Sequence, residues 1–216
     1  MSNPPRARLD VGTLLAAVED APPVSAVEAF AACLARALDA RDLSFLIADF
    51  SGQALVRLGR AGSGGATRTQ GRETAEPVPL AGTPHGRALA SQTVERETVA
   101  GETRLYAPVT NRGEAIGVLE LRLDEPPDEA MLADVALAAH TFAYVVIANR
   151  RFTDLFEWGQ RSLPLSLAAE IQHRLLPAAY TCEAGQFSSR AGWSPPARWA
   201  ATRSTSPWSA TPCTCR

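Results

Sequence analysis

Apolar residues recur at helical spacing near both ends of the chain and in a different pattern between them. Residues 24–40 carry an apolar side chain every three or four positions, and residues 9–18 and 128–158 do the same. The last stretch has two adjacent apolar stripes, as on a helix that packs on a sheet with one face and on a second helix with the other. Residues 43–123 are instead typical of strands and turns.

The strand signals are strongest in two predicted hairpins. Residues 103–109 and 115–123 alternate apolar and polar side chains around a turn at 110–113. A compact apolar run at 43–50 ends in a Ser-Gly turn, and a return strand follows at 53–58. Strands in the middle and helices at the ends predict an α+β fold: an antiparallel sheet with the terminal helices packed on one face, a long C-terminal linker helix and a disordered tail.

Shorter elements are predicted between these hairpins. Residues 59–73 are rich in Gly, Ser, Thr and Arg and predict a loop, and residues 78–80 suggest a short strand. Residues 84–91 predict a helix that Thr83 caps, with a proline at its first position. Residues 93–99 predict one more strand.

Composition narrows the class of protein. Of the 216 residues, 46% are hydrophobic and 20% are charged, and the formal net charge is −2, so no overall basicity indicates a nucleic-acid partner. Every basic residue is arginine, a bias that indicates a GC-rich genome. The chain begins without an apolar signal segment, and its longest apolar run, 135–148, is too short to span a bilayer. We therefore expect a cytoplasmic protein with no nucleic-acid or membrane partner.

A first family resemblance covers residues 20–150. The apolar strand at 43–50 with its Ser-Gly turn, the segment from Tyr106 to Leu121 and the helix that begins near Asp128 together resemble a GAF domain. The resemblance implies a sensory domain with a small-molecule effector, whose identity the sequence does not give. His85 lies on the helix that borders the ligand cavity in this family; we expect a surface histidine, and the alternative is a role in the pocket.

A second resemblance begins at Leu167. The sequence Leu-Ala-Ala-Glu-Ile-Gln-His-Arg-Leu-Leu-Pro resembles the entry helix of bacterial PPM-type protein serine/threonine phosphatases of the stage-II-sporulation-E branch. The matching residues are Gln172, Leu175, Leu176 and Pro177. In an intact domain of this family, Mn or Mg would be the expected cofactor, and a first catalytic strand would begin within residues 186–193.

The sequence departs from the phosphatase pattern at that point. Residues 184–216 contain no Asp or Glu, whereas a two-metal phosphatase site needs several carboxylates. We therefore expect a non-catalytic chain without a cofactor, with the phosphatase reading frame lost near Ser188. The alternative is a natural disordered tail.

These resemblances predict four parts: an N-terminal segment, 1–19; a GAF-like sensor domain, 20–150; a helical linker with the phosphatase entry helix, 151–177; and an incomplete phosphatase start with an irregular tail, 178–216.

The chain shows few other features of catalytic chemistry. Cys33 lies in an apolar helical pattern and is predicted to be a buried thiol, and the C-x-C pair near the C-terminus lacks the spacing of a zinc site. No serine, cysteine or histidine has recognisable triad partners.

The favoured function is a GAF-type sensory, regulatory and dimerisation module of a PPM-type phosphatase. The alternatives are a free-standing GAF-like adaptor and an active metal-dependent phosphatase. The long apolar stripe continues beyond the sensor domain and so predicts a homodimer. The candidate dimer residues on this stripe are Leu132, Val135, Ala139, Phe142, Val146, Phe152 and Leu155.

Overall fold

The computed structural model describes residues 8–62, 67–68, 77–161, 167–168, 171, 175, 181–184 and 187–190. It divides into two units, Met1–Ala178 and Ala179–Arg216. The helices of the first unit are α1 (Val11–Glu19), the 3-10 turn η1 (Pro23–Ser25), α2 (Ala26–Leu38), α3 (Pro84–Ser91), α4 (Glu129–Asn149) and α5 (Leu155–Gly159). Its strands are β1 (Asp42–Ala48), β2 (Ala54–Gly62), β3 (Thr67–Arg68), β4 (Val78–Pro79), β5 (Glu95–Val99), β6 (Glu102–Asn111) and β7 (Glu114–Leu123).

These strands form one antiparallel sheet in the order β3-β2-β1-β7-β6-β5, with β4 paired to β2. The two predicted hairpins are its centre, because β1 pairs with both β2 and β7, and β7 pairs with β6. The β6–β7 turn is built on Arg112 and Gly113, which both have a positive φ, as a tight hairpin turn requires. The predicted α+β fold is therefore confirmed.

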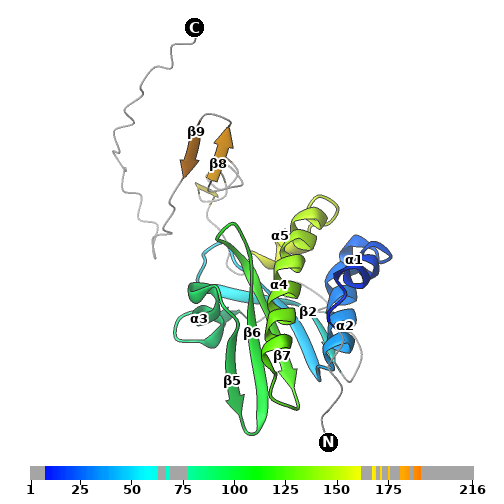
Figure 1. The fold of residues 1–216 in the computed structure, drawn as a ribbon. Helices are drawn as coiled ribbons and strands as arrows, with labels where there is room; N and C mark the ends of the chain where they lie inside the picture. Colours follow the sequence, from blue (N-terminus) through cyan, green and yellow to red (C-terminus); the bar gives the residue numbers. More distant parts are fainter. Residues whose placement is uncertain are drawn as a thin grey trace, which may run out of the picture. The chain divides into compact units, whose positions relative to one another are not determined.

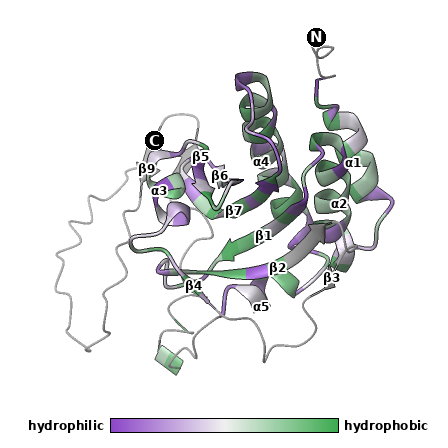
Figure 2. Ribbon diagram, turned by 90° about the horizontal axis from the view of Figure 1, so that it is seen from below, coloured by the Kyte–Doolittle hydropathy of each residue, from purple (hydrophilic) through white to green (hydrophobic). Residues whose placement is uncertain are grey.

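One face of the sheet carries the main core, which we call the helical face. Helices α1, α2 and α4 lie together on this side of the sheet (Figure 1), and Figure 2 shows hydrophobic residues along both layers. Phe30 of α2, Phe45 of β1 and Phe142 of α4 meet at its centre, with ring centroids 4.4 and 4.8 Å from the Phe142 ring. All three side chains are fully buried, so the helical periodicity in the sequence reports this core.

The close pairing of β1 and β7 depends on a glycine. A Cβ at Gly117 would lie 2.1 Å from the carbonyl oxygen of Leu46 and 2.8 Å from the Phe45 ring. No other residue fits at this position without moving the backbone of β1.

The predicted long helix at 128–158 is broken into two. Asp128 caps α4 as expected, since its carboxylate accepts a hydrogen bond from the Met131 N–H at 2.7 Å, but α4 ends at Asn149. After a turn, α5 packs Phe156 into the same core. The Phe50 N–H also donates to the Gln160 carbonyl at 2.9 Å, fastening the end of α5 to the chain after β1. Burial of Phe156 thus outweighs the continuous helical pattern of the sequence.

Helix α4 is long and apolar enough to cross a membrane by length and composition alone, and it extends beyond the apolar run predicted at 135–148. Seven of its residues are nevertheless buried in this structure, against the sheet and α2. It is therefore a core helix of the folded unit.

The second unit contains a small antiparallel hairpin of β8 (Thr181–Ala184) and β9 (Phe187–Arg190). Strand β9 falls within residues 186–193, where a first strand was predicted. The predicted disordered tail follows this hairpin. The rest of 178–216 lies outside the described residues.

Candidate functional site

The other face of the sheet, under α3, is polar as well as apolar. Its small apolar core consists of Leu46, Ala48, Leu55, Ala88, Tyr106 and Val118. Beside this core lies a group of side chains that can form hydrogen bonds or carry charge, which we call the polar cluster: Ser44, Arg57, His85, Tyr106 and Glu120. This face is the candidate site, because buried polar groups concentrate here.

Glu120 is the centre of the polar cluster. Its Oε2 accepts a hydrogen bond from Nη2 of Arg57 at 2.8 Å, and Nε2 of His85 lies 3.7 Å from the same oxygen. Nη1 of Arg57 donates to the hydroxyl of Ser44. The side chain of Glu120 is only 7% exposed, while that of Arg57 is 35% exposed. The guanidinium of Arg57 therefore contacts the buried carboxylate of Glu120 and is itself partly exposed to solvent.

Strand register brings these residues together. Glu120 of β7 pairs with Ser44 of β1 on one side and with Tyr106 of β6 on the other, so all three point to the same face. Arg57 of β2 pairs with Leu46, two residues further along β1, and reaches diagonally to Glu120. The sequence separation is 63 residues for this ion pair, which the local pattern does not reveal.

Helix α3 places His85 over the sheet. Thr83 caps the helix by accepting a hydrogen bond from the Gly86 N–H at 3.2 Å, as predicted. A Cβ at Gly86 would lie 2.1 Å from the Leu80 carbonyl oxygen, so glycine allows α3 to approach the preceding loop closely. His85 is 8% exposed, and its ring lies edge-on to Tyr106 with centroids 4.6 Å apart. The interpretation of His85 as a surface histidine is wrong.

The electrostatics of the polar cluster keep Glu120 ionised. Burial raises the pKa of Glu120, but the imidazole of His85 and the guanidinium of Arg57 outweigh it and lower the pKa to about 2. Burial and the neighbouring carboxylates of Glu120 and Glu97 raise the pKa of Tyr106, whose hydroxyl donates to Oε2 of Glu97 at 3.2 Å. The cluster thus holds a fixed carboxylate, a guanidinium and a neutral phenol.

The charged surface continues along β6 and β7. Arg122 lies two residues beyond Glu120, and its Nε is 3.8 Å from Oδ2 of Asp42. Arg104 pairs directly with Arg122 across the sheet and has its Nε 3.2 Å from Oε2 of Glu102. Charged side chains therefore continue along β6 and β7 beyond the polar cluster.

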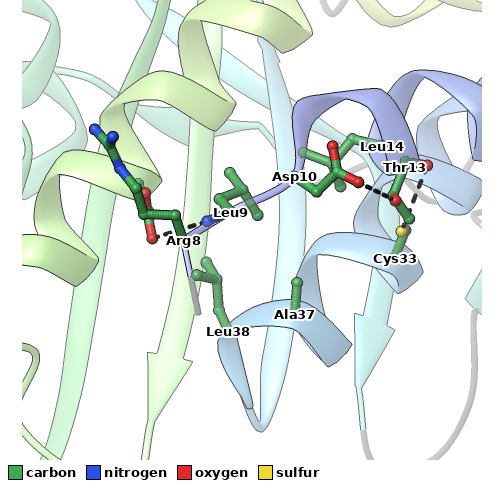
Figure 3. Close-up of a pocket in the computed structure, with 9 residues that line it drawn as sticks. Arg8, Leu9, Asp10, Thr13, Leu14, Cys33, Ala37 and Leu38 are labelled. Carbon is green, nitrogen blue, oxygen red and sulfur yellow. Dashed lines mark hydrogen bonds between the residues drawn. The ribbon is translucent and has the colours of Figure 1, made fainter. Parts of the chain in front are cut away.

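A separate hollow of about 230 Å³ lies on the helical side, between the start of α1, α2 and α4 (Figure 3). Leu14 and Leu38 line it, while Asp134 accepts a hydrogen bond from the Leu9 N–H at 3.3 Å. Cys33 also lines it and is buried, as predicted, with its Sγ 4.0 Å from the carbonyl of Thr13. The thiol is therefore on the opposite face from the polar cluster.

The structure corrects the candidate dimer residues. Val135, Ala139, Phe142 and Val146 are completely buried inside the chain itself and leave no surface for a second copy. They face the sheet because the stripe chosen from the sequence is the core stripe. Leu132 and Leu155 pack partly against this core, and Phe152 is 66% exposed.

Four other positions on α4 form an exposed stripe. Leu137, Tyr144 and Ile147 are 45%, 53% and 39% exposed, and His140 lies exposed between them with its ring 5.3 Å from that of Tyr144. Their spacing of three, four and three residues is that of a coiled-coil seam. We refer to these residues as the exposed α4 stripe.

The phosphatase-like helix is described only in part. Leu167, Ile171 and Leu175 are helical and exposed, whereas Gln172, Leu176 and Pro177 lie outside the described residues. In the described part of the chain, no three His, Cys, Asp or Glu side chains gather in a way that could hold a metal ion.

Sequence reasoning missed Ser44, Arg57 and Glu120. One signal was available in the sequence: Glu120 is a charged residue within an apolar strand, between Leu119 and Leu121. The sequence contains no signal for their mutual contact, because it depends on the order of the strands.

No protein-family model and no curated protein matches the sequence. Solved structures do match. The GAF domain of an Acinetobacter phosphoenolpyruvate-protein phosphotransferase aligns over 66% of this chain and 95% of its own, with a TM-score of 0.51 and 14% identity.

Two further structures align over similar lengths. A Neisseria meningitidis free methionine-R-sulfoxide reductase, solved in complex with its substrate, is 18% identical over 66% of this chain and 89% of its own, with a TM-score of 0.52. A methyl-accepting chemotaxis protein fragment is 13% identical over 65% and 98%, with the same TM-score. At these identities the matches establish the fold, and the chain has the fold of a GAF domain.

Proposed function

We propose that this chain is a GAF-type sensory and regulatory module of bacterial signalling, without catalytic activity, that binds a small polar effector at the polar cluster. The observation that carries the proposal is the buried carboxylate of Glu120, held by Arg57 and next to His85 beneath α3. A purely structural sheet face is usually apolar, because charges lose hydration on burial.

The chemistry of the cluster suits binding more than reaction. Glu120 is ionised and already accepts from Arg57, so it is a poor general base at neutral pH. Ser44, the serine of the cluster, accepts a hydrogen bond from Arg57, and the same guanidinium also binds the neighbouring carboxylate of Glu120. The free thiol Cys33 is on the other face, although one of the structural neighbours with this fold is a reductase.

We further propose that the regulated partner is a PPM-type protein phosphatase domain. Supporting this are the entry-helix sequence that ends at Pro177 and the exposure of Leu167 and Leu175, which are 77% and 78% exposed. Exposed leucines at helical spacing are suited to packing on a following domain. The effector would shift the module between two states, which requires different affinities for them.

The chain is also proposed to act as a homodimer, through the exposed α4 stripe. A helix that places Leu137, Tyr144 and Ile147 in a coiled-coil spacing on its surface can pair with the same helix of a second copy. The opposite side of α4 packs on β6 and β7, so pairing would connect directly to the sheet that carries Glu120.

A thermal-shift screen tests the effector proposal. A library of amino acids, organic acids, nucleotides and sugars is added to the wild type, to Glu120→Gln and to Glu129→Gln, a control on α4 with an exposed glutamate. A ligand that binds only the native state raises the melting temperature. We expect at least one compound to stabilise the wild type and the control but not Glu120→Gln.

The opposite result has a clear meaning. If no compound stabilises the wild type, or if all hits act equally on Glu120→Gln, the polar cluster does not bind an effector. A free-standing interaction adaptor, using the exposed α4 stripe, would then be the better account.

Catalysis is tested separately with a generic aryl phosphate and Mn²⁺. We expect no hydrolysis above the buffer rate. Activity that copurifies with the protein and disappears on chelation would contradict the non-catalytic proposal and favour a metal-dependent phosphatase.

A further inference from the structure

Several buried nitrogen atoms on the polar face have no hydrogen-bond partner. Three buried side-chain nitrogen atoms in the described part of the chain lack a hydrogen-bond partner: both ring nitrogens of His85 and Nε of Arg122. His85 belongs to α3, and Arg122 lies two residues beyond Glu120 on β7, so its side chain shares the face of Glu120. Leaving a buried polar group unpaired typically costs about 1 to 3 kcal/mol, so a partner that satisfies these atoms would gain that energy.

Neither neighbouring carboxylate satisfies these nitrogens. Oε2 of Glu120 accepts from Arg57 at 2.8 Å, whereas Nε2 of His85 is 3.7 Å away, outside hydrogen-bond distance. Oδ2 of Asp42 is likewise 3.8 Å from Nε of Arg122.

Two arginines also face each other across the sheet. Arg104 of β6 and Arg122 of β7 are a directly paired register position, and their side chains are 28% and 33% exposed. Like charges at such a position are destabilising unless a counter-charge joins them. Nε of Arg104 donates to Oε2 of Glu102 at 3.2 Å, but Glu102 is on the same strand as Arg104. In the strand register it does not lie between Arg104 and Arg122.

We propose that the effector carries an oxyanion, a carboxylate or a phosphate group, that binds at Arg122 and Arg104, with the body of the molecule next to His85. Guanidinium groups bind such anions through paired N–H donors, which the ring nitrogen of a histidine can supplement. This inference rests on the proposed function and names the class of its ligand. Glu120 then acts as the fixed element that orients Arg57 beside the bound molecule.

The test measures binding of sodium succinate and of sodium phosphate by calorimetry and thermal shift, with sodium chloride at matched ionic strength as the reference. The variants are Arg122→Gln, Arg122→Lys and Arg104→Gln. The matched control is Arg87→Gln, an arginine on α3 whose side chain is 53% exposed and 3.5 Å from Glu95.

We expect one of the two anions to stabilise the wild type and Arg87→Gln beyond chloride, and each of the three variants to weaken its binding about tenfold or more. Arg122→Lys keeps the charge and loses the paired donors, so it remains informative if Arg122→Gln does not fold. Preference for succinate or phosphate identifies the anion as carboxylate or phosphate.

Equal stabilisation by chloride, or equal binding by Arg87→Gln and the three variants, would overturn the proposal. The proposal would also be overturned by a library compound that has no oxyanion and whose binding is lost in Glu120→Gln. That result would leave the proposed sensory function intact. If nothing binds at all, the sensory function itself fails.

Discussion

The two faces of the sheet differ in the kind of side chains that they bury. The helical face buries aromatic and aliphatic side chains between three helices and the strands, with Phe30, Phe45 and Phe142 in ring contact. The α3 face covers a smaller apolar core and leaves charged side chains such as Arg57, Arg104 and Arg122 partly exposed. Close packing stabilises the first face, and charge pairing organises the second.

The difference teaches where function can be accommodated in this fold. A tightly packed apolar layer tolerates little change and has no groups to recognise a polar molecule. The α3 face has an ionised carboxylate, partly exposed arginines and buried nitrogen atoms that lack a hydrogen-bond partner. The main apolar core is therefore on one side of the sheet, and the proposed effector site is on the other.

The largest expected effect comes from the helical face. Phe142→Ala removes a fully buried ring that contacts Phe30 and Phe45, and should lower the free energy of unfolding by about 3 to 5 kcal/mol. Urea denaturation followed by circular dichroism measures it. A loss below that of an ordinary surface substitution would mean that the core is not formed as described.

The α3 face should respond less, and with a dependence on pH. Glu120→Gln removes the charge that pairs with Arg57 and should cost about 3 kcal/mol at neutral pH. Since the pKa of Glu120 is lowered from 4.5 to about 2 in the folded protein, its ionised form stabilises the fold above pH 4.5.

That stabilisation, about 3 kcal/mol by the size of the pKa shift, is lost as the pH falls towards 2. Denaturation of the wild type and Glu120→Gln across this range measures the difference between them. The unfolding free energies of the two proteins should become equal at low pH. A difference that does not change with pH would show that the neighbours of Glu120 do not lower its pKa.

A smaller effect is expected at the cap of α3. Thr83→Ala removes the hydroxyl that accepts from the Gly86 N–H and should cost about 1 kcal/mol. Amide hydrogen exchange should show loss of protection in α3 and unchanged protection in α2. Equal loss in both helices would mean that the two faces do not respond separately.

The smallest effect on folding should come from the exposed α4 stripe. Tyr144→Ala, at a position that is 53% exposed, should change the unfolding free energy of a monomer by less than about 0.5 kcal/mol. Leu137→Glu should instead abolish dimers, as measured by sedimentation, while leaving the far-ultraviolet circular dichroism unchanged. A dimer that persists in Leu137→Glu would exclude this stripe as the interface.

The helical face could be predicted from the sequence, and the site could not. Helical periodicity identified the stripe of Val135 and Phe142, because a helix repeats its buried positions locally. The same periodicity does not distinguish residues buried in the core from residues in an interface, so the stripe was assigned to a dimer. It also does not show that the helix ends at Asn149.

The polar cluster is invisible to local pattern for a different reason. Glu120 and Arg57 are 63 residues apart, and only the antiparallel order of β2, β1 and β7 brings them together. The sequence favoured a surface position for His85, with a cavity position implied by the family resemblance as the alternative, and its burial against Tyr106 follows from the packing of α3 on β6.

The most direct test of recognition on the α3 face is hydrogen exchange with and without the library compound that raises the melting temperature most. The account predicts new protection in α3, β6 and β7 around His85 and Glu120, with none at the hollow between α1 and α2. Protection centred on that hollow, near Leu14 and Cys33, would contradict it and place the effector on the helical side.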